Sequence, residues 1–220
     1  MSAEETRKHA HWTRGETESS RILPFSDGVF AIAITLLAMQ LDVPLRNIPN
    51  ETSASLAHRV LQLWPMFESF VISFLVIGMF WVTHHRLFRL IRRYDTALIW
   101  LNIILLLCIS FLPFSSELLG THTGNGFAVM FYAGSITVTG IVQLAMWLYA
   151  AHRHRLIDRE LERHTIWFFT LRSLTPPFVF SISIPISLIS PRLALNLWVL
   201  IFVIQFILSR IYHIRGTKLA

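Results

Sequence analysis

The sequence has 220 residues, of which 54% are apolar and only 15% are charged, and its formal net charge is +6 at pH 7. This balance excludes an ordinary soluble domain and indicates an integral membrane protein. The basic residues recur at the ends of apolar runs, so they do not form the single patch that is typical of nucleic-acid binding. The lone cysteine, Cys108, excludes a disulfide framework.

The first apolar stretch covers residues 21–43 and reads RILPFSDGVFAIAITLLAMQLDV. Phe25 to Val43 is 19 residues long, which as a helix spans about 28 Å, close to the ~30 Å of membrane hydrocarbon. Pro24, Ser26 and Asp27 suit a helix start, where oxygen atoms satisfy free amides and a carboxylate suits the helix dipole. A charge near a membrane span is costly, so Asp27 is equally a candidate functional residue.

One stripe of this helix consists of Ile32, Thr35, Leu36 and Met39, spaced at i, i+3, i+4 and i+7. Three bulky apolar side chains and one hydroxyl could line a narrow pore. They could equally form a seam packed on a neighbouring helix, and periodicity does not distinguish the two.

Five further spans follow a polar loop from Pro44 to Arg59. Proline residues mark two of them: Pro113 is expected to end the third span, and Pro176, Pro177 and Pro185 to interrupt the fifth. The expected ranges are 61–82, 94–112, 127–151, 166–189 and 193–212.

The basic residues, lysine and arginine, are concentrated in the connections on one side of these spans. The N-terminus and every second connection hold 15 basic residues, and the other connections hold 3. By the positive-inside rule this predicts six spans with both termini in the cytoplasm. We expect a cytoplasmic tail over residues 1–20, a six-helix membrane domain over 21–213 and a cytoplasmic C-terminal tail over 214–220.

Several polar residues need partners inside this bundle. Asp27, His84 and Asn102 fall at similar depth in the first three spans, with Arg21 just below, so hydrogen bonds between them would offset their burial. His84 and His85 are adjacent and face different ways, so at most one of them joins the cluster. Arg172 can snorkel to the interface or bond carbonyl groups freed by the nearby prolines.

The first span carries a specific resemblance. Arg21, followed by Phe25-Ser26-Asp27 and an apolar run to Leu37, resembles the first-helix signature of the transmembrane protein 175 family. These are endosomal and lysosomal potassium channels and their shorter bacterial relatives. Phe80-Trp81 with His84-His85, and Asn102 before an apolar run, are similar to the family's second- and third-helix patterns.

The resemblance implies an all-α homotetramer in which copies of the first helix surround a central pore. Ile32, Leu36 and Met39 would form apolar constrictions, and a partly dehydrated potassium ion would rest transiently near the Thr35 hydroxyl groups. A set of polar and aromatic residues would support the pore helix: Arg21, Phe25, Ser26, Asp27, His84 and Asn102.

We therefore expect a leak-like, potassium-selective, multi-pass channel of the plasma membrane. Its partners would be the lipid bilayer, permeant monovalent cations and copies of itself, with no cofactor, resident metal or nucleic acid. No TVGYG segment is present, so a carbonyl filter is not available. The alternatives are a secondary transporter with a broken fifth span, a proton-permeable pore of the same architecture, and a membrane enzyme using Ser26, His84 and Asp27.

Overall fold

The computed structural model describes residues 3–41, 52–122 and 124–216, and it describes side-chain surroundings from residue 21 to residue 211 within those ranges. The fold is all-α. Its elements in chain order are α1 (Ala3–Met39), α2 (Ser53–Gln62), α3 (Trp64–Leu90), α4 (Thr96–Thr121), α5 (Gly126–Ala151), the short 3-10 helix η1 (His152–His154), α6 (Arg163–Ile189) and α7 (Pro191–Gly216).

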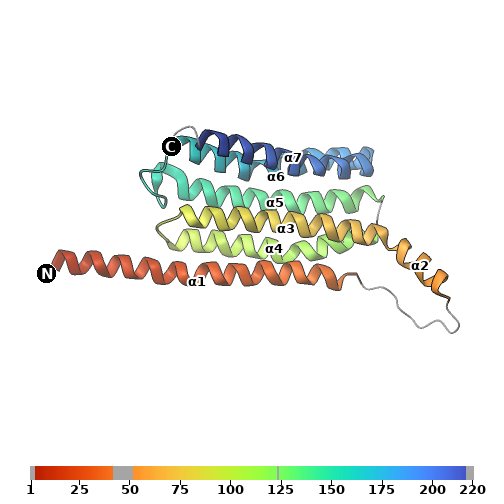
Figure 1. Ribbon diagram of the computed structural model, residues 1–220, viewed down its shortest axis with the longest axis horizontal. Helices are drawn as coiled ribbons and strands as arrows, with labels where there is room; N and C mark the ends of the chain where they lie inside the picture. The colour runs from red at the N-terminus through yellow and green to blue at the C-terminus, as the bar shows by residue number, and fades with distance from the viewer. Residues whose placement is uncertain (1–2, 42–51, 123, 217–220) are drawn as a thin grey trace.

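Six segments of this described chain are long and apolar enough to cross a membrane, as the sequence predicts. They are Arg21–Met39, Trp64–Leu90, Thr96–Thr121, Gly126–His154, Arg163–Ile189 and Pro191–Ile211. The long helices run side by side along one axis, and α1 and α7 lie on opposite sides of the bundle (Figure 1). The start of α1 and the end of α7 lie at the same end of the bundle, together with the α3–α4 and α5–α6 connections (Figure 1).

The helices pack in two groups, which are joined mainly by the packing of α4 on α5. Within the described residues, α1 contacts α3 and α4, whereas α5, α6 and α7 pack on one another. Large aromatic side chains fill the core, among them Trp147, Trp198, Tyr132, Phe80 and Phe180. Because α1 lies at the edge, only one of its faces is covered by its own chain.

A glycine sets the close approach of α5 to α6. A Cβ atom placed on Gly140 would lie 2.6 Å from Cδ of Pro177, so no larger residue fits without a shift.

The prolines do not break the helices, contrary to the sequence-based expectation. Pro113 lies inside α4, which continues to Thr121, and α6 runs unbroken through Pro176, Pro177 and Pro185. Pro176 lacks an N–H and therefore leaves the carbonyl group of Arg172 without its helical donor. Gln205 of α7 supplies one, since its Nε2 lies 3.0 Å from that oxygen. A neighbouring helix therefore repairs the defect, as membrane bundles allow.

Three further boundaries differ from the expectation. α1 begins at Ala3, so Pro24, Ser26 and Asp27 lie inside a continuous helix and not at its start. The predicted polar loop from Pro44 to Arg59 contains the start of α2, whose N-cap Thr52 accepts a hydrogen bond from the Ser55 amide; residues 42–51 of that loop lie outside the described residues. The second span extends to Leu90, so His84 and His85 lie inside α3 and not beyond its end.

Candidate functional site

The first helix has one buried face and one exposed face. Ser26, Phe30, Ala33 and Leu37 are buried against α3 and α4. On the other face Ile32 is 61% exposed, Leu36 40% and Met39 76%. The predicted stripe therefore does not pack on another span of its own chain, which removes the packed-seam alternative within one protomer.

Thr35 lies on the same exposed face. Its hydroxyl group donates a hydrogen bond to the Ile32 carbonyl oxygen at 2.9 Å. The hydroxyl proton is therefore committed to the helix backbone, while the oxygen lone pairs stay available. An oxygen presented in this way can coordinate a cation or accept a hydrogen bond from a water molecule.

A buried chain of hydrogen bonds holds the opposite face. Asn102 Nδ2 of α4 donates to Ser26 Oγ of α1 at 3.0 Å, and Ser26 in turn donates to the Ile22 carbonyl at 2.9 Å. The Asn102 Oδ1 atom lies 2.8 Å from Nε2 of His84 on α3. Since the amide nitrogen of Asn102 is the donor to Ser26, its oxygen must be the acceptor, and His84 carries its proton on Nε2.

Aromatic rings enclose His84. Its ring centroid lies 5.4 Å from that of Phe30 and 4.4 Å from that of Phe88, and the side chain is fully buried. His84 is thus fixed by one hydrogen bond and two ring contacts. This arrangement locks α1, α3 and α4 together at one depth.

Asp27 belongs to a second, separate contact. Its Oδ1 atom accepts a hydrogen bond from Trp81 Nε1 at 2.8 Å, and the Trp81 ring lies 5.7 Å from the His85 ring. The resemblance placed Trp81 in the second-helix pattern but assigned it no partner. Its indole N–H is the partner of Asp27 that sequence reasoning missed. The available signal was that an indole N–H within a membrane span needs an acceptor.

The six predicted support residues therefore divide into three sets. Ser26, His84 and Asn102 form the hydrogen-bonded chain, and Asp27 pairs with Trp81. Arg21 and Phe25 are exposed, so within one chain they do not join the buried cluster. Asn102 separates Ser26 from His84, and Asp27 faces Trp81, so the three residues of the enzyme alternative do not form a nucleophile–base pair.

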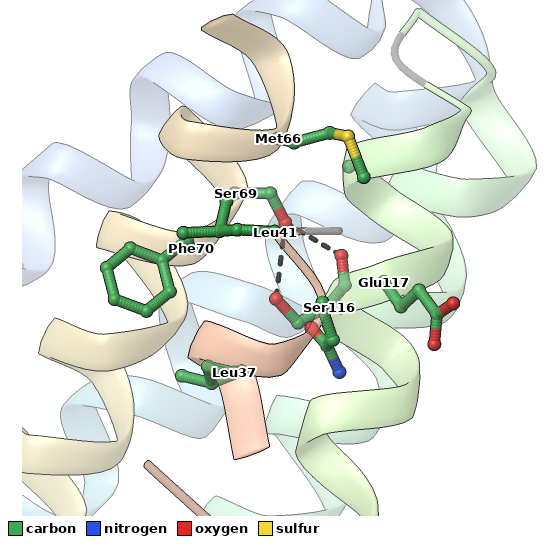
Figure 2. A pocket seen from close by; sticks show the side chains of 9 residues that line it. Leu37, Leu41, Met66, Ser69, Phe70, Ser116 and Glu117 are labelled. Carbon is green, nitrogen blue, oxygen red and sulfur yellow. Dashed lines mark hydrogen bonds between the residues drawn. The ribbon is translucent and has the colours of Figure 1, made fainter. Parts of the chain in front are cut away.

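The other end of the α1 span is tied to α4 by a contact that the sequence did not reveal. Gln40 Nε2 donates to the Pro113 carbonyl oxygen at 2.6 Å. Beside it, a small pocket is lined by residues of α1, α3 and α4, and Ser69 donates to the Ser116 carbonyl across it at 2.7 Å (Figure 2). The first span is thus anchored at both ends while its stripe remains free.

The fold and this site define the protein as an all-α, multi-pass membrane protein whose first span leaves an apolar stripe with a hydroxyl group uncovered by its own chain. Residues 21–113 match the family described as endosomal/lysosomal potassium channel TMEM175. A potassium channel of Chamaesiphon minutus is 36% identical over 184 residues, covering 82% of this chain and 90% of that protein. A potassium channel of Streptomyces collinus is 33% identical over 182 residues, covering 78% and 86%.

A solved structure is similar as well. It is the crystal structure of a lysosomal potassium-selective channel TMEM175 homolog from Chamaesiphon minutus, with a TM-score of 0.74 and 33% identity, covering 88% of this chain and 97% of that one. The chain belongs to the TMEM175 family. It is accordingly related to ion channels and not to enzymes.

Proposed function

We propose that this protein is a potassium channel of the cell membrane, formed by four copies whose first helices surround a shared pore. The observation that carries the proposal is the exposure of Ile32, Leu36 and Met39 on a helix whose opposite face is tied to α3 and α4. One helix cannot enclose a pore, so the stripe requires further copies of itself. The potassium-channel relatives of similar length support this assignment.

Apolar rings from Ile32, Leu36 and Met39 would control the passage of ions by excluding water from narrow points. An ion must shed part of its hydration shell to pass, and potassium does so at lower cost than sodium. The Thr35 oxygens would offer a resting place between the rings. Selectivity would then arise from dehydration and pore width instead of a carbonyl filter.

The basic residues support an orientation with both termini in the cytoplasm. The start of α1, the end of α7 and the two Arg-rich connections share one end of the bundle, and this is the end we assign to the cytoplasm. A transporter is disfavoured because α6 is continuous through its prolines, so the broken helix of that alternative is missing.

Reversal potentials of the purified full chain in planar bilayers test the proposal. With potassium on one side and sodium on the other, we expect a reversal potential displaced toward the potassium equilibrium potential. A reversal potential that follows only an imposed pH gradient would indicate the proton-permeable pore. Flux that requires a coupled proton or sodium gradient would indicate a transporter. A measured mass of the purified particle that does not correspond to four copies of the chain would contradict the tetramer.

A further inference from the structure

A short helix precedes the second membrane span and has almost no support from the bundle. α2 (Ser53–Gln62) is separated from α3 by Leu63 alone, and among the described elements it contacts only α3. None of its residues is buried, and it extends away from the bundle at the end opposite the start of α1 and the end of α7 (Figure 1). A helix of 10 residues is marginally stable in water, because isolated helices need about 12–15 residues. The described part of the chain therefore does not supply the surface that holds α2.

The two faces of α2 differ in chemistry. At ~100° per residue, the apolar side chains that follow Ser53 fall on one arc of about 160°; they are Ala54, Leu56, Ala57, Val60 and Leu61. The rest of the circumference is polar, with Ser55, His58, Arg59 and Gln62. Leu61 is 70% exposed, and Leu56 and Val60 are exposed as well. The apolar face is thus uncovered by the described chain.

Local helix chemistry explains the ends of α2 but not its apolar face. Thr52 caps the first turn by accepting a hydrogen bond from the Ser55 amide at 3.3 Å, and Arg59 in the last turn suits the negative end of the helix dipole. Neither feature requires apolar side chains. An arc of apolar residues at helical spacing indicates a partner of apolar chemistry.

The position of α2 places it at the edge of the bilayer. α3 has 27 residues and is about 40 Å long, roughly 10 Å more than the hydrocarbon layer. Its first residue is the exposed Trp64, and tryptophan is enriched at the boundary between acyl chains and headgroups. Val71 and Leu75 are exposed on the same side of α3, at i+7 and i+11 from Trp64. Because one residue joins the helices, all of α2 lies within about 20 Å of this boundary.

We propose that α2 lies in the membrane interface at this end of the bundle, with Leu56, Val60 and Leu61 inserted between lipid acyl chains. His58 and Arg59 then face the headgroups, whose phosphates complement a helix that contains no acidic residue. A bilayer surrounds the six spans at this depth whatever the oligomeric state, so lipid is favoured over a second copy of the chain as the occupant. The proposal rests on the membrane spans and not on potassium conduction.

Spin labels on introduced cysteines test this placement in vesicles of phosphatidylcholine and phosphatidylglycerol, in a full-length Cys108→Ala background. Leu61→Cys and Gln62→Cys are a matched pair, because the two positions are adjacent, exposed and on opposite faces. Collisions of the label with oxygen, which partitions into acyl chains, should exceed collisions with a water-soluble nickel chelate severalfold at position 61. The preference should reverse at position 62. Val60→Cys should behave like Leu61→Cys, and His58→Cys like Gln62→Cys.

Two outcomes of the labelling experiment would overturn the proposal. Free access of the nickel chelate to all four positions would place α2 in water. Protection of positions 60 and 61 from both reagents, with spin–spin broadening between labelled copies, would show that a second copy of the chain covers the apolar face.

Hydrogen–deuterium exchange in lipid nanodiscs gives a second readout that needs no label and keeps Cys108. Leu61→Asn should accelerate exchange of the α2 amides about tenfold, because the helix loses an inserted apolar side chain. Gln62→Asn introduces the same residue on the polar face, so it controls for helix propensity and should have a much smaller effect. Equal acceleration in the two variants would contradict the insertion of the apolar face.

Discussion

His84 on α3 and Asn102 on α4 are joined by a 2.8 Å hydrogen bond that is fully buried in the bundle. Asn102 uses its other amide atom to hold Ser26 of α1. The orientation of the first helix therefore depends on a side chain of a different helix. This relationship fixes which face of α1 is left uncovered, and hence which residues are available for a pore.

Replacing Asn102 by leucine should destabilise the protein. The change roughly keeps the side-chain volume but leaves the buried His84 N–H without its acceptor and the Ser26 oxygen without its donor, at a cost of about 1–3 kcal/mol. We expect a lower unfolding midpoint in detergent. Asn196→Leu on α7 is the matched control, because Asn196 is exposed and its replacement should leave the midpoint nearly unchanged. Equal midpoints for the two variants would show that the hydrogen-bonded chain contributes little.

A polar residue in the stripe should change conduction. Leu36→Asn would hydrate one of the proposed apolar rings, so we expect a severalfold higher single-channel conductance and a weaker preference for potassium over sodium. Leu200→Asn on α7 is the control, since Leu200 is 46% exposed and Leu36 40%, and α7 lies across the bundle from α1. Ile32→Asn should behave like Leu36→Asn. Wild-type currents from both stripe variants at normal expression would exclude this pore lining.

Gly140→Ala should separate α5 from α6. Its new methyl group would lie 2.6 Å from Cδ of Pro177, and relieving that overlap should cost about 1–3 kcal/mol. Gly134→Ala lies on the same helix with no atom within 4 Å of the new Cβ, so it should be neutral or stabilising by up to about 1 kcal/mol. If the unfolding midpoints of both variants move in the same direction, helix propensity and not this contact dominates the effect of the substitutions on stability.

The connection between α3 and α4 should make stability depend on pH. Partial burial alone would raise the pKa of Asp95, but hydrogen bonds from Tyr149 and Leu98 and the charge of Arg155 outweigh it, so the pKa falls below its ordinary value of 3.8. The fold therefore favours the carboxylate, and its contribution is complete above that value and is lost as the pH falls through the lower pKa of the folded state.

This predicts that the unfolding midpoint of the wild type decreases between pH 5 and pH 3 by more than that of Asp95→Asn. The two contacts to the Asp95 Oδ2 atom, from Tyr149 at 2.6 Å and Arg155 at 3.3 Å, provide the test. Tyr149→Phe should reduce the pH dependence without removing it, because the Leu98 cap remains at 2.9 Å. Parallel curves for the wild type and Asp95→Asn would contradict the assignment.

The sequence by itself determined the class of protein and the number of spans. Apolar runs long enough to cross a bilayer must be helices, because lipid offers no partner for free backbone groups. The stripe containing Ile32 and Met39 was visible as a helical periodicity. That Asn102 and His84 lie at one depth also followed from counting residues from the span ends.

Only the tertiary structure decided which partner each polar group takes and which helix face stays uncovered. Periodicity shows that Ile32 and Leu36 share a face but not whether another helix covers it, since that depends on how six helices pack. The contacts of Trp81 with Asp27 and of Gln205 with the Arg172 carbonyl join residues 54 and 33 positions apart. A proline predicts a missing hydrogen bond in its own helix, but the donor that replaces it comes from a neighbour that only the folded bundle brings near.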